Sequence, residues 1–306
     1  MAEIKHIKTI SEFHRTRLLD PPEHPLISVF DYAKVDMLPE LRGMSWMFDF
    51  YLITLKKNFN AKIKYGQQAY DFDEGVMFFI APGQVFSIDH NTGIPEDKSG
   101  WMLLIHPDFL WNTPLAKGIK RYEYFSYSIN EALFVSGKEE QILMNVVDNI
   151  RIECHANIDS YSQNIIISQV ETLLNYSERF YNRQFLTREK ANHNILEGLE
   201  RVLDQYFEQQ DLINKGLPTV TFLGQELNIS PKYLSNLLRI VTGRSAQQHI
   251  HEKLLNKAKS QLGNTNLSVG EIAYALGFEH PQSFSKFFKS KTQISPLEFR
   301  SLFPAN

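Results

Sequence analysis

The chain has 306 residues, which suits two domains better than one, and 43% of them are hydrophobic, as in packed globular proteins. No window approaches the roughly 18 uncharged apolar residues of a membrane span, and the N-terminus lacks a signal-peptide pattern. The single cysteine, Cys154, excludes an intramolecular disulfide framework and a multi-cysteine metal site, and it fits a reducing cytoplasm. The net charge of −3 conceals an uneven distribution: residues 217–306 hold 10 Lys and Arg against 5 Asp and Glu, whereas residues 1–216 hold 22 against 30.

The first part of the chain is predicted to be β-rich. Residues 1–20 are mixed and polar without a clear period and indicate a flexible lead-in before the helix-breaking prolines at 21, 22 and 25. Short strands separated by turn signals then predict an antiparallel sandwich or barrel. The expected strands are Leu26–Tyr32, Phe48–Leu55, Asn60–Tyr65, Tyr70–Gly75, Val76–Ile80, Val85–Ile88 and Trp101–His106.

This β-rich half shows no pattern typical of catalysis. The strands between residues 62 and 88 contain no histidine, and His90 and His106 are isolated, so we expect neither a metal site nor a cofactor. A nucleophile with a nearby base and a glycine-rich phosphate loop are also missing from the pattern, so we predict that the chain is not an enzyme. Aromatic residues could line a ligand pocket, although core packing explains most of them equally well: Phe50, Tyr51, Tyr65, Tyr70, Phe78 and Phe79.

Helical periodicity begins after the strands. Apolar residues recur at helical spacing over 136–152 and 161–181, and these two helices either close against the strands or form a homodimer interface. Residues 183–193 are charged and polar and are predicted to be a linker. An amphipathic helix over 195–207 follows, and it is expected to pack on the first of two similar helical units.

The two units become apparent when residues 219–229 are aligned with residues 268–278. Thr219 and Ser268 can each cap a helix, and Asn228 and Gly277 both tolerate the positive φ that a tight helix-ending turn requires. Gly224 aligns with Ala273, where a small residue lets a second helix approach closely.

A second helix follows each turn. Leu234, Leu237 and Leu238 align with Phe284, Phe287 and Phe288 in an apolar stripe at i, i+3 and i+4, while polar and basic residues occupy the other face. One such hairpin could be a simple packing unit, but two copies that agree in cap, turn and core stripe favour a helix-turn-helix written twice. One helix over 245–262 joins them, and its length of roughly 27 Å could set two recognition helices one turn of DNA apart.

These motifs resemble the DNA-binding domain of the AraC/XylS family of transcription regulators. The match consists of Ser268-Val-x-Glu-Ile-Ala-x-x-Leu-Gly-Phe278, Ser283-Phe-Ser-x-x-Phe-Lys289 and Ile294-Ser-Pro-x-Glu-Phe-Arg300, and it covers about a third of the chain. Pro281 departs from the family pattern, because it removes a backbone donor and displaces the expected side chain, which leaves the role of His280 open.

The resemblance implies which residues face DNA. Lys232, Ser235 and Asn236 match base-facing positions of the first recognition helix, and those of the second are Gln282, Ser283, Ser285 and Lys286. Arg239, Lys289 and Lys291 are assigned to phosphates, which fix register without reading sequence. A solvated surface residue is the competing interpretation for each of them.

The resemblance also implies an α+β, two-domain architecture. Residues 1–135 would form an antiparallel cupin-like β-barrel that senses a small-molecule effector, residues 136–182 a helical segment that makes a homodimer, and residues 194–306 an all-α DNA-binding domain with two helix-turn-helix units. The expected function is a cytoplasmic transcriptional regulator that binds promoter DNA, with activation as the family habit, repression as an alternative, and RNA polymerase as a further candidate partner.

Two other interpretations stay open at this point. The first is a cupin-type enzyme or carrier with a vestigial DNA-binding tail. The second is effector-independent DNA binding, in which the barrel serves only as a dimerisation platform. The sequence does not identify an effector or a target gene.

Overall fold

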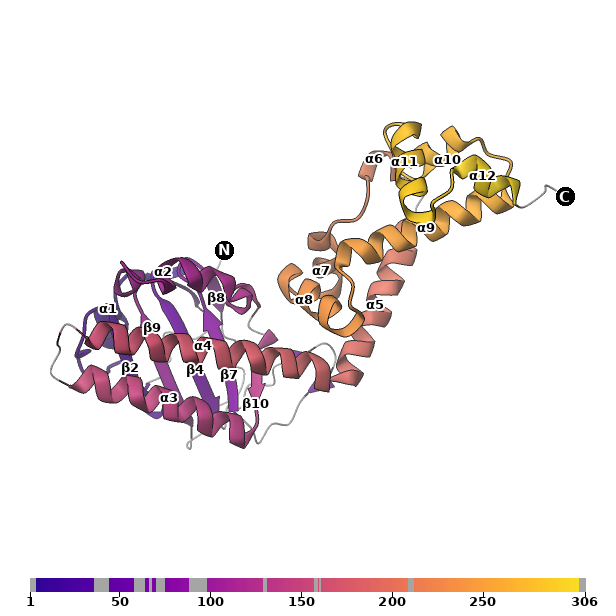
Figure 1. Ribbon diagram of the computed structural model, residues 1–306. Helices are drawn as coiled ribbons and strands as arrows, with labels where there is room; N and C mark the ends of the chain where they lie inside the picture. Colours follow the sequence, from indigo (N-terminus) through magenta and orange to yellow (C-terminus); the bar gives the residue numbers. More distant parts are fainter. Residues whose placement is uncertain are drawn as a thin grey trace. The chain divides into compact units, whose positions relative to one another are not determined.

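The computed structural model describes residues 4–35, 44–57, 64–65, 68–69, 75–87, 98–128, 131–156, 159, 161–208 and 212–302. The chain divides into two compact units, residues 1–187 and residues 188–306, and Figure 1 shows both. The first is a mixed α/β unit and the second is helical, so the predicted α+β class with a C-terminal helical domain is confirmed.

The strands of the first unit form two main sheets within the described ranges. The larger sheet is fully antiparallel in the order β10-β7-β4-β9-β2, whereas the smaller, in the order β1-β3-β8, pairs β1 with β3 in parallel. A short hairpin pairs β5 with β6. Their bounds are β1 Ile4–Ile7, β2 Ile27–Asp31, β3 Ser45–Phe48, β4 Tyr51–Lys57, β5 Lys64–Tyr65, β6 Gln68–Ala69, β7 Gly75–Ile80, β8 Val85–Ser87, β9 Ser99–Ile105 and β10 Leu133–Val135.

Helices cover one face of the larger sheet. Figure 1 shows α3 (Gly137–His155) and α4 (Ser162–Thr187) lying side by side across it, and both contact its strands. The two helices that the sequence predicts over 136–152 and 161–181 therefore close against the strands. The shorter helical elements of this unit are α1 Ile10–Thr16, η1 Tyr32–Lys34, η3 Pro107–Leu110, α2 Leu115–Gly118, η4 Ile119–Arg121 and η5 Glu123–Ser126.

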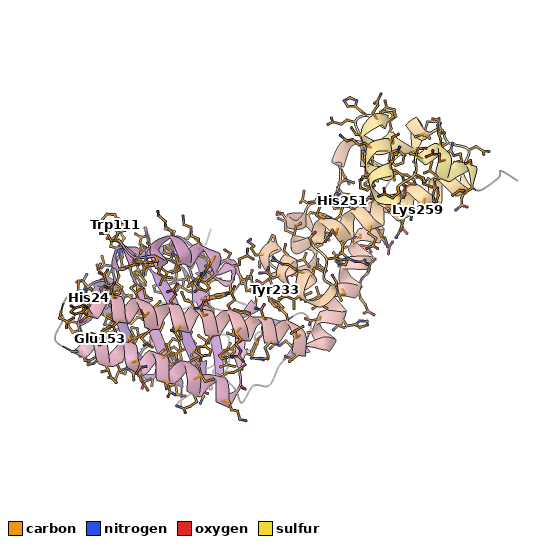
Figure 2. All side chains as sticks on the ribbon, in the orientation of Figure 1. His24, Trp111, Glu153, Tyr233, His251 and Lys259 are labelled. Carbon is orange, nitrogen blue, oxygen red and sulfur yellow. The ribbon has the colours of Figure 1, made fainter. Side chains whose placement is uncertain are left out.

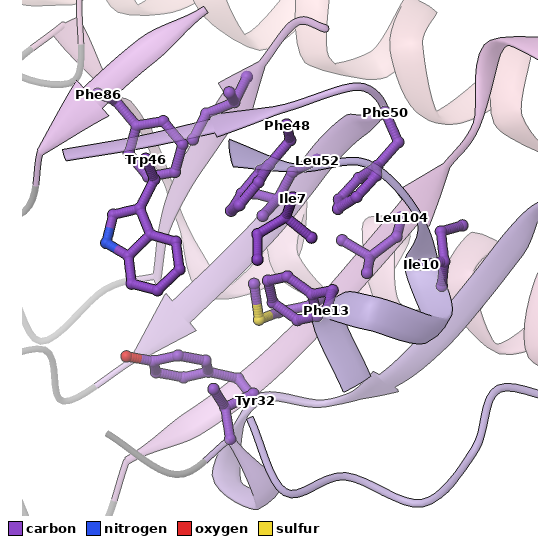
Figure 3. Close-up of a cluster of buried hydrophobic side chains, with 13 residues drawn as sticks. Ile7, Ile10, Phe13, Tyr32, Trp46, Phe48, Phe50, Leu52, Phe86 and Leu104 are labelled. Carbon is purple, nitrogen blue, oxygen red and sulfur yellow. The ribbon is translucent and has the colours of Figure 1, made fainter. Parts of the chain in front are cut away.

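An aromatic core fills the space between the two sheets. Figure 3 shows side chains from both sheets and α1 converging there. The rings of Phe48 and Phe50 stack at 5.0 Å, and the ring of Phe13 is edge-on to both. The larger sheet is thus buried on both faces, by this core and by α3 and α4. Double burial explains why β7 is a continuous apolar run without the alternation of a half-exposed strand.

Residues 4–16 correct the prediction of a flexible lead-in. They form β1 and α1, because Ile7, Ile10 and Phe13 all insert into the aromatic core and Thr9 caps the helix by accepting a hydrogen bond from the Glu12 backbone. The polar residues between them concealed this short buried stripe. The predicted strand over 48–55 is likewise interrupted, since β3 ends at Phe48 and β4 begins at Tyr51.

The predicted closed barrel is not confirmed. The described strands belong to separate sheets, and β10 and β2 stand at the two ends of the larger one. Most of the predicted strands 60–65 and 70–75, together with Ile88, lie outside the described residues. The strands expected at 26–32, 76–80 and 101–106 are present as β2, β7 and β9.

The predicted linker over 183–193 is helical. Residues 183–187 complete α4, and α5 (Glu189–Glu208) begins after the single residue Arg188. The segment is polar because Arg183 and Gln184 bind protein groups: Arg183 pairs with Glu139, and the buried Gln184 binds the backbone of residues 132 and 134.

The second unit is a set of packed helices. After α5 come α6 Leu212–Lys215, α7 Val220–Leu227, α8 Pro231–Thr242, α9 Ala246–Asn264, α10 Val269–Ala275, α11 Pro281–Thr292 and α12 Pro296–Ser301. None of the helices in the described ranges of either unit is long and apolar enough to span a bilayer.

Candidate nucleic-acid interface

The first helix-turn-helix consists of α7, a tight turn and α8. Thr219 accepts a hydrogen bond from the Phe222 backbone at 3.1 Å, which is the predicted cap of α7. Ser230 caps α8 in the same way, by accepting a hydrogen bond from the Tyr233 backbone at 3.2 Å. Asn228 ends α7 in the left-handed region at φ 55°, as predicted.

Gly224 lets the chain after the turn pass close to α7. A Cβ added at this position would lie 2.7 Å from the carbonyl oxygen of Ile229 and 3.3 Å from the nitrogen of Pro231. The prediction of a small residue for close approach is therefore confirmed in this copy. The aligned Ala273 is fully buried in the second copy, where its methyl group is accommodated.

The second helix-turn-helix repeats this construction with one difference. Ser268 and Glu271 form a reciprocal capping box at the start of α10, and Gly277 makes the turn at φ 82°, as predicted. The recognition helix α11 then begins at Pro281, and its N-cap residue, His280, makes no side-chain capping bond. The proline is accommodated because it occupies the first helical position, where a backbone donor has no intrahelical partner.

The apolar stripes of both recognition helices face inward. Leu234, Leu237 and Leu238 are fully buried in α8. Tyr233, labelled in Figure 2, is also buried there, and burial raises the pKa of its hydroxyl well above the usual range. In α11, Phe284 and Phe288 are fully buried, and the third stripe residue, Phe287, is half-buried beside Phe278.

The predicted DNA-facing side chains lie off these stripes. In α8, Lys232 and Arg239 are exposed while Ser235 and Asn236 are half-buried. The Ser235 hydroxyl donates to the Pro231 carbonyl at 2.8 Å, and Arg239 donates to the Asn236 side-chain oxygen. In α11, four of the five are exposed and Ser285 is half-buried; the exposed four are Gln282, Ser283, Lys286 and Lys289.

Three carboxylates of this unit are held by local hydrogen bonds or by an ion pair. Glu271 and Glu298 each accept bonds from the N-cap serine of their own capping box, and those bonds lower the pKa of both carboxyl groups. Glu252 is paired with Arg244. No such carboxylate lies on the outer face of α8 or α11, whose described residues carry only basic charges.

The helix α9 joins the two helix-turn-helix motifs. It has 19 residues, begins with a capping box between Ser245 and Gln248, and at 1.5 Å per residue is about 28 Å long. Its predicted inward residues are buried, except that Leu255 is half-buried: Ile250, Leu254, Ala258 and Leu262. The predicted connecting helix is therefore confirmed.

The opening helix α5 packs on the first helix-turn-helix and on α9. Gly198 of α5 lies against Leu227 of α7, since an added Cβ would be 2.9 Å from its Cδ2 atom, which confirms the expected packing. Lys253 of α9 binds the carboxylates of Glu200 and Asp204 at 3.3 and 2.6 Å. These bonds raise the pKa of Lys253.

Two features of this unit are missing from the sequence-based prediction. The final helix α12 packs on α9 and α11, and Arg300 donates to the carbonyls of Leu262 and Leu267, so this residue of the family motif has a structural contact. The other feature is the short helix α6 between α5 and α7. Four residues are too few for helical periodicity to be visible.

In the first unit, the described residues group no candidate metal ligands and place part of the predicted pocket in the core. Within those ranges, no three His, Cys, Asp or Glu side chains gather where they would hold a metal ion. Two of the predicted pocket aromatics have core contacts: Phe50 lies in the core between the sheets, and Phe79 packs on Tyr124 at 4.5 Å.

Comparison with known proteins places the second unit. A family model described as "Helix-turn-helix domain" matches residues 223–301. The transcriptional regulator YisR of Bacillus subtilis is 28% identical over 44% of this chain, and the chain spans about half of that relative's length. The regulator YfiF of the same organism is 29% identical over 78% of this chain and 72% of its own length.

A solved structure with a similar sequence is the C-terminal domain of AraT, a response regulator from Geobacillus stearothermophilus. It is 27% identical, covers 37% of this chain and 88% of its own length, and superposes with a TM-score of 0.32. The C-terminal unit carries a helix-turn-helix domain of the AraC type, and the relatives of this chain are AraC/XylS-type regulators.

Proposed function

We propose that this AraC-type transcriptional regulator binds double-stranded DNA through both of its helix-turn-helix units. The observation that carries the proposal is the pairing of two complete units, each with a polar and basic outer face, on one connecting helix of about 28 Å. That length is close to one turn of B-DNA, about 34 Å, so one chain can present α8 and α11 to successive major grooves.

The proposed division of roles follows side-chain chemistry. Amide and lysine side chains on an inserted helix can pair with base edges, so we assign the following residues to base contacts: Lys232, Ser235, Asn236, Gln282, Ser283, Ser285 and Lys286. Arg239 and Lys289 lie nearer the C-terminal ends of their helices and are assigned to phosphates.

The test replaces one exposed lysine on each recognition helix. Lys232→Ala combined with Lys286→Ala removes two contacts, each worth about 1–3 kcal/mol, so specific affinity should fall at least about tenfold while the fold is retained. A matched control, Lys117→Ala with Lys120→Ala, removes the same charge from exposed positions of the first unit. If the Lys232 and Lys286 variant binds a selected site like the wild type, the assignment of these faces to DNA is wrong.

We also propose that the first unit senses a small-molecule effector and shifts the DNA-binding unit between states of different affinity. In support, two basic side chains lie against aromatic rings of its core. Lys56 lies 4.8 Å from the ring of Tyr32, and Arg17 lies 4.5 Å from the ring of Trp46. This proposal does not depend on closure of a cupin-like barrel. A thermal-shift screen of the full chain against small metabolites tests it, since a true effector must stabilise the protein and also change its affinity for DNA.

Homodimerisation through α3 and α4 is proposed as well. Apolar side chains on their outer faces support it: Ile142 is 36%, Ile165 44% and Ile152 68% exposed. Sedimentation equilibrium of the wild type and of Ile152→Glu tests this arrangement, because a charge in an apolar interface should dissociate the dimer. We also propose that this regulator lies in the cytoplasm and activates transcription through RNA polymerase.

A further inference from the structure

The short helix α6 covers the turn of the second helix-turn-helix, although the next helix along the chain, α7, belongs to the first. Figure 1 shows α6 beside α10 and α11, with the chain returning from there to α7. The Leu212 side chain is 2% exposed, and its carbonyl oxygen would lie 2.8 Å from a Cβ added at Gly277. The first residue of α6 therefore packs directly on the backbone of that turn.

This contact explains a difference between the two copies. Both turns need a left-handed residue, and the first copy uses Asn228 at φ 55°, whose side chain is exposed. The second copy uses Gly277 at φ 82°. Asparagine also tolerates that conformation, so φ alone does not demand glycine there. The closeness of Leu212 does, because an added side chain would collide with its backbone.

The other end of this segment is held near the first helix-turn-helix. The Gly216 carbonyl accepts a hydrogen bond from the Tyr206 hydroxyl at 3.1 Å, and the Tyr206 ring packs on Phe222 of α7 at 5.1 Å. The Gly216 amide also donates to the Leu212 carbonyl at 2.8 Å, which closes α6. Residues 212–216, here called the α6 strap, thus form a second connection between the two helix-turn-helix motifs, in addition to α9.

We propose that Leu212 is a positioning residue, and that the α6 strap fixes the orientation of the second helix-turn-helix relative to the first and thereby the spacing of the two DNA elements. A single connecting helix fixes the distance between the two helix-turn-helix motifs but leaves each of them able to rotate slightly relative to that helix. A second attachment at the turn of the second motif removes that freedom. The inference rests on the proposed binding of DNA by both units.

The first experiment measures affinity against spacing with the full-length protein. The duplex is the best site selected from random DNA by the wild type, with its spacer lengthened or shortened by one and two base pairs. Two base pairs rotate one element by about 70° relative to the other. We expect the wild type to lose about tenfold or more in affinity at that change, and Gly277→Asn and Leu212→Ala to lose less than about threefold.

Two controls separate positioning from damage. Asn228→Gly exchanges the same residue types at the turn of the first helix-turn-helix, and its affinity should depend on spacer length as that of the wild type does. A duplex with only the first element should bind the wild type and both strap variants equally. If both variants keep the wild-type profile, or weaken all spacings by the same factor, the strap does not set spacing and the proposal is overturned.

A second measurement does not need DNA. Nitroxide labels are attached at Gln225→Cys on α7 and Tyr274→Cys on α10, which are both exposed positions, in a full chain that also carries Cys154→Ser. They report the distance between the two helix-turn-helix motifs. Gly277→Asn should broaden the distance distribution relative to the wild type, and an unchanged width would contradict the proposal. A wild type that selects no two-element DNA site would refute the proposed function, while this measurement would still decide the role of the strap.

Discussion

At the scale of single residues, Gly224 illustrates a position where the backbone leaves no room for a side chain. Gly224→Ala would place a Cβ 2.7 Å from the Ile229 carbonyl oxygen, so the turn of the first helix-turn-helix must shift. We expect a loss of about 1–3 kcal/mol in the free energy of unfolding. Thermal unfolding of the second unit by calorimetry measures it.

The control for that substitution is Gly118→Ala. Gly118 has a helical φ of −69°, and an added Cβ would meet nothing within 4 Å. This change should be neutral or should stabilise by up to about 1 kcal/mol. If Gly224→Ala behaves like Gly118→Ala, the close approach at the turn is not a constraint.

His14 makes a prediction about pH. Its Nδ1 donates to the Asp20 carbonyl and its Nε2 accepts from the Ser28 hydroxyl at 3.0 Å, and burial, only partly opposed by Asp20, lowers its pKa below the usual 6.5. The unfolded chain therefore takes up a proton at this residue before the folded chain does. The contribution of His14 to stability is complete above pH 6.5 and is lost as the pH falls below it through the folded pKa.

Tryptophan fluorescence can follow this effect, since all three tryptophans lie in the first unit. Urea unfolding of the wild type at falling pH should show declining stability, and His14→Gln should show a shallower decline. His193→Gln, at an exposed position of α5, is the control. Parallel pH profiles for the wild type and His14→Gln would contradict the prediction.

At the scale of elements, the end of α4 protects the edge of the larger sheet. Gln184 is fully buried, accepts from the Phe134 backbone at 2.8 Å and donates to the Ala132 carbonyl at 3.1 Å, so its amide pairs with the chain at β10 as another strand would. Arg183 donates to the Phe134 carbonyl from the same helix.

Gln184→Leu would leave those two buried backbone groups without this partner. Each costs about 1–3 kcal/mol, so the first unit should lose about 2–6 kcal/mol of stability, measured by urea unfolding with fluorescence detection. Asn182→Leu, on an exposed position of the same helix, should change it by less than about 0.5 kcal/mol. Equal effects of the two substitutions would show that the pairing contributes nothing.

The elements also show where prediction from sequence succeeds. The C-terminal helices could be predicted because their signals are local: Ser268 and Glu271 cap α10, Gly277 ends its turn, and the apolar stripe of α11 follows within one segment. The candidate DNA-facing residues follow from the same periodicity, as the positions that the stripe leaves outside.

The strand pairing of the N-terminal unit could not be predicted, because it joins residues that are distant in sequence. The parallel pairing of β1 with β3 joins residues about 40 apart, and no local pattern reports it. Gln184 looked like part of a linker because its polar partner lies in another element. The role of Leu212 was hidden for the same reason, since its contact with Gly277 spans 65 residues.

At the scale of the whole molecule, charge is divided between the two units. Residues 188–306 hold 14 Lys and Arg against 11 Asp and Glu, whereas residues 1–187 hold 18 against 24. DNA should therefore be attracted to the second unit and repelled by much of the first, which favours binding in one orientation. Four basic residues on α8 and α11 should take part: Lys232, Arg239, Lys286 and Lys289.

Selection from random duplex DNA by the full-length protein, followed by affinity measurements against salt, tests the central claim most directly. We predict an enriched motif with two elements about one helical turn apart. With the two phosphate contacts assigned to Arg239 and Lys289, affinity should fall at least about tenfold between about 50 and about 200 mM salt. A protein that enriches no motif, or one whose affinity for DNA is insensitive to salt, would contradict the account of two helix-turn-helix units reading one site.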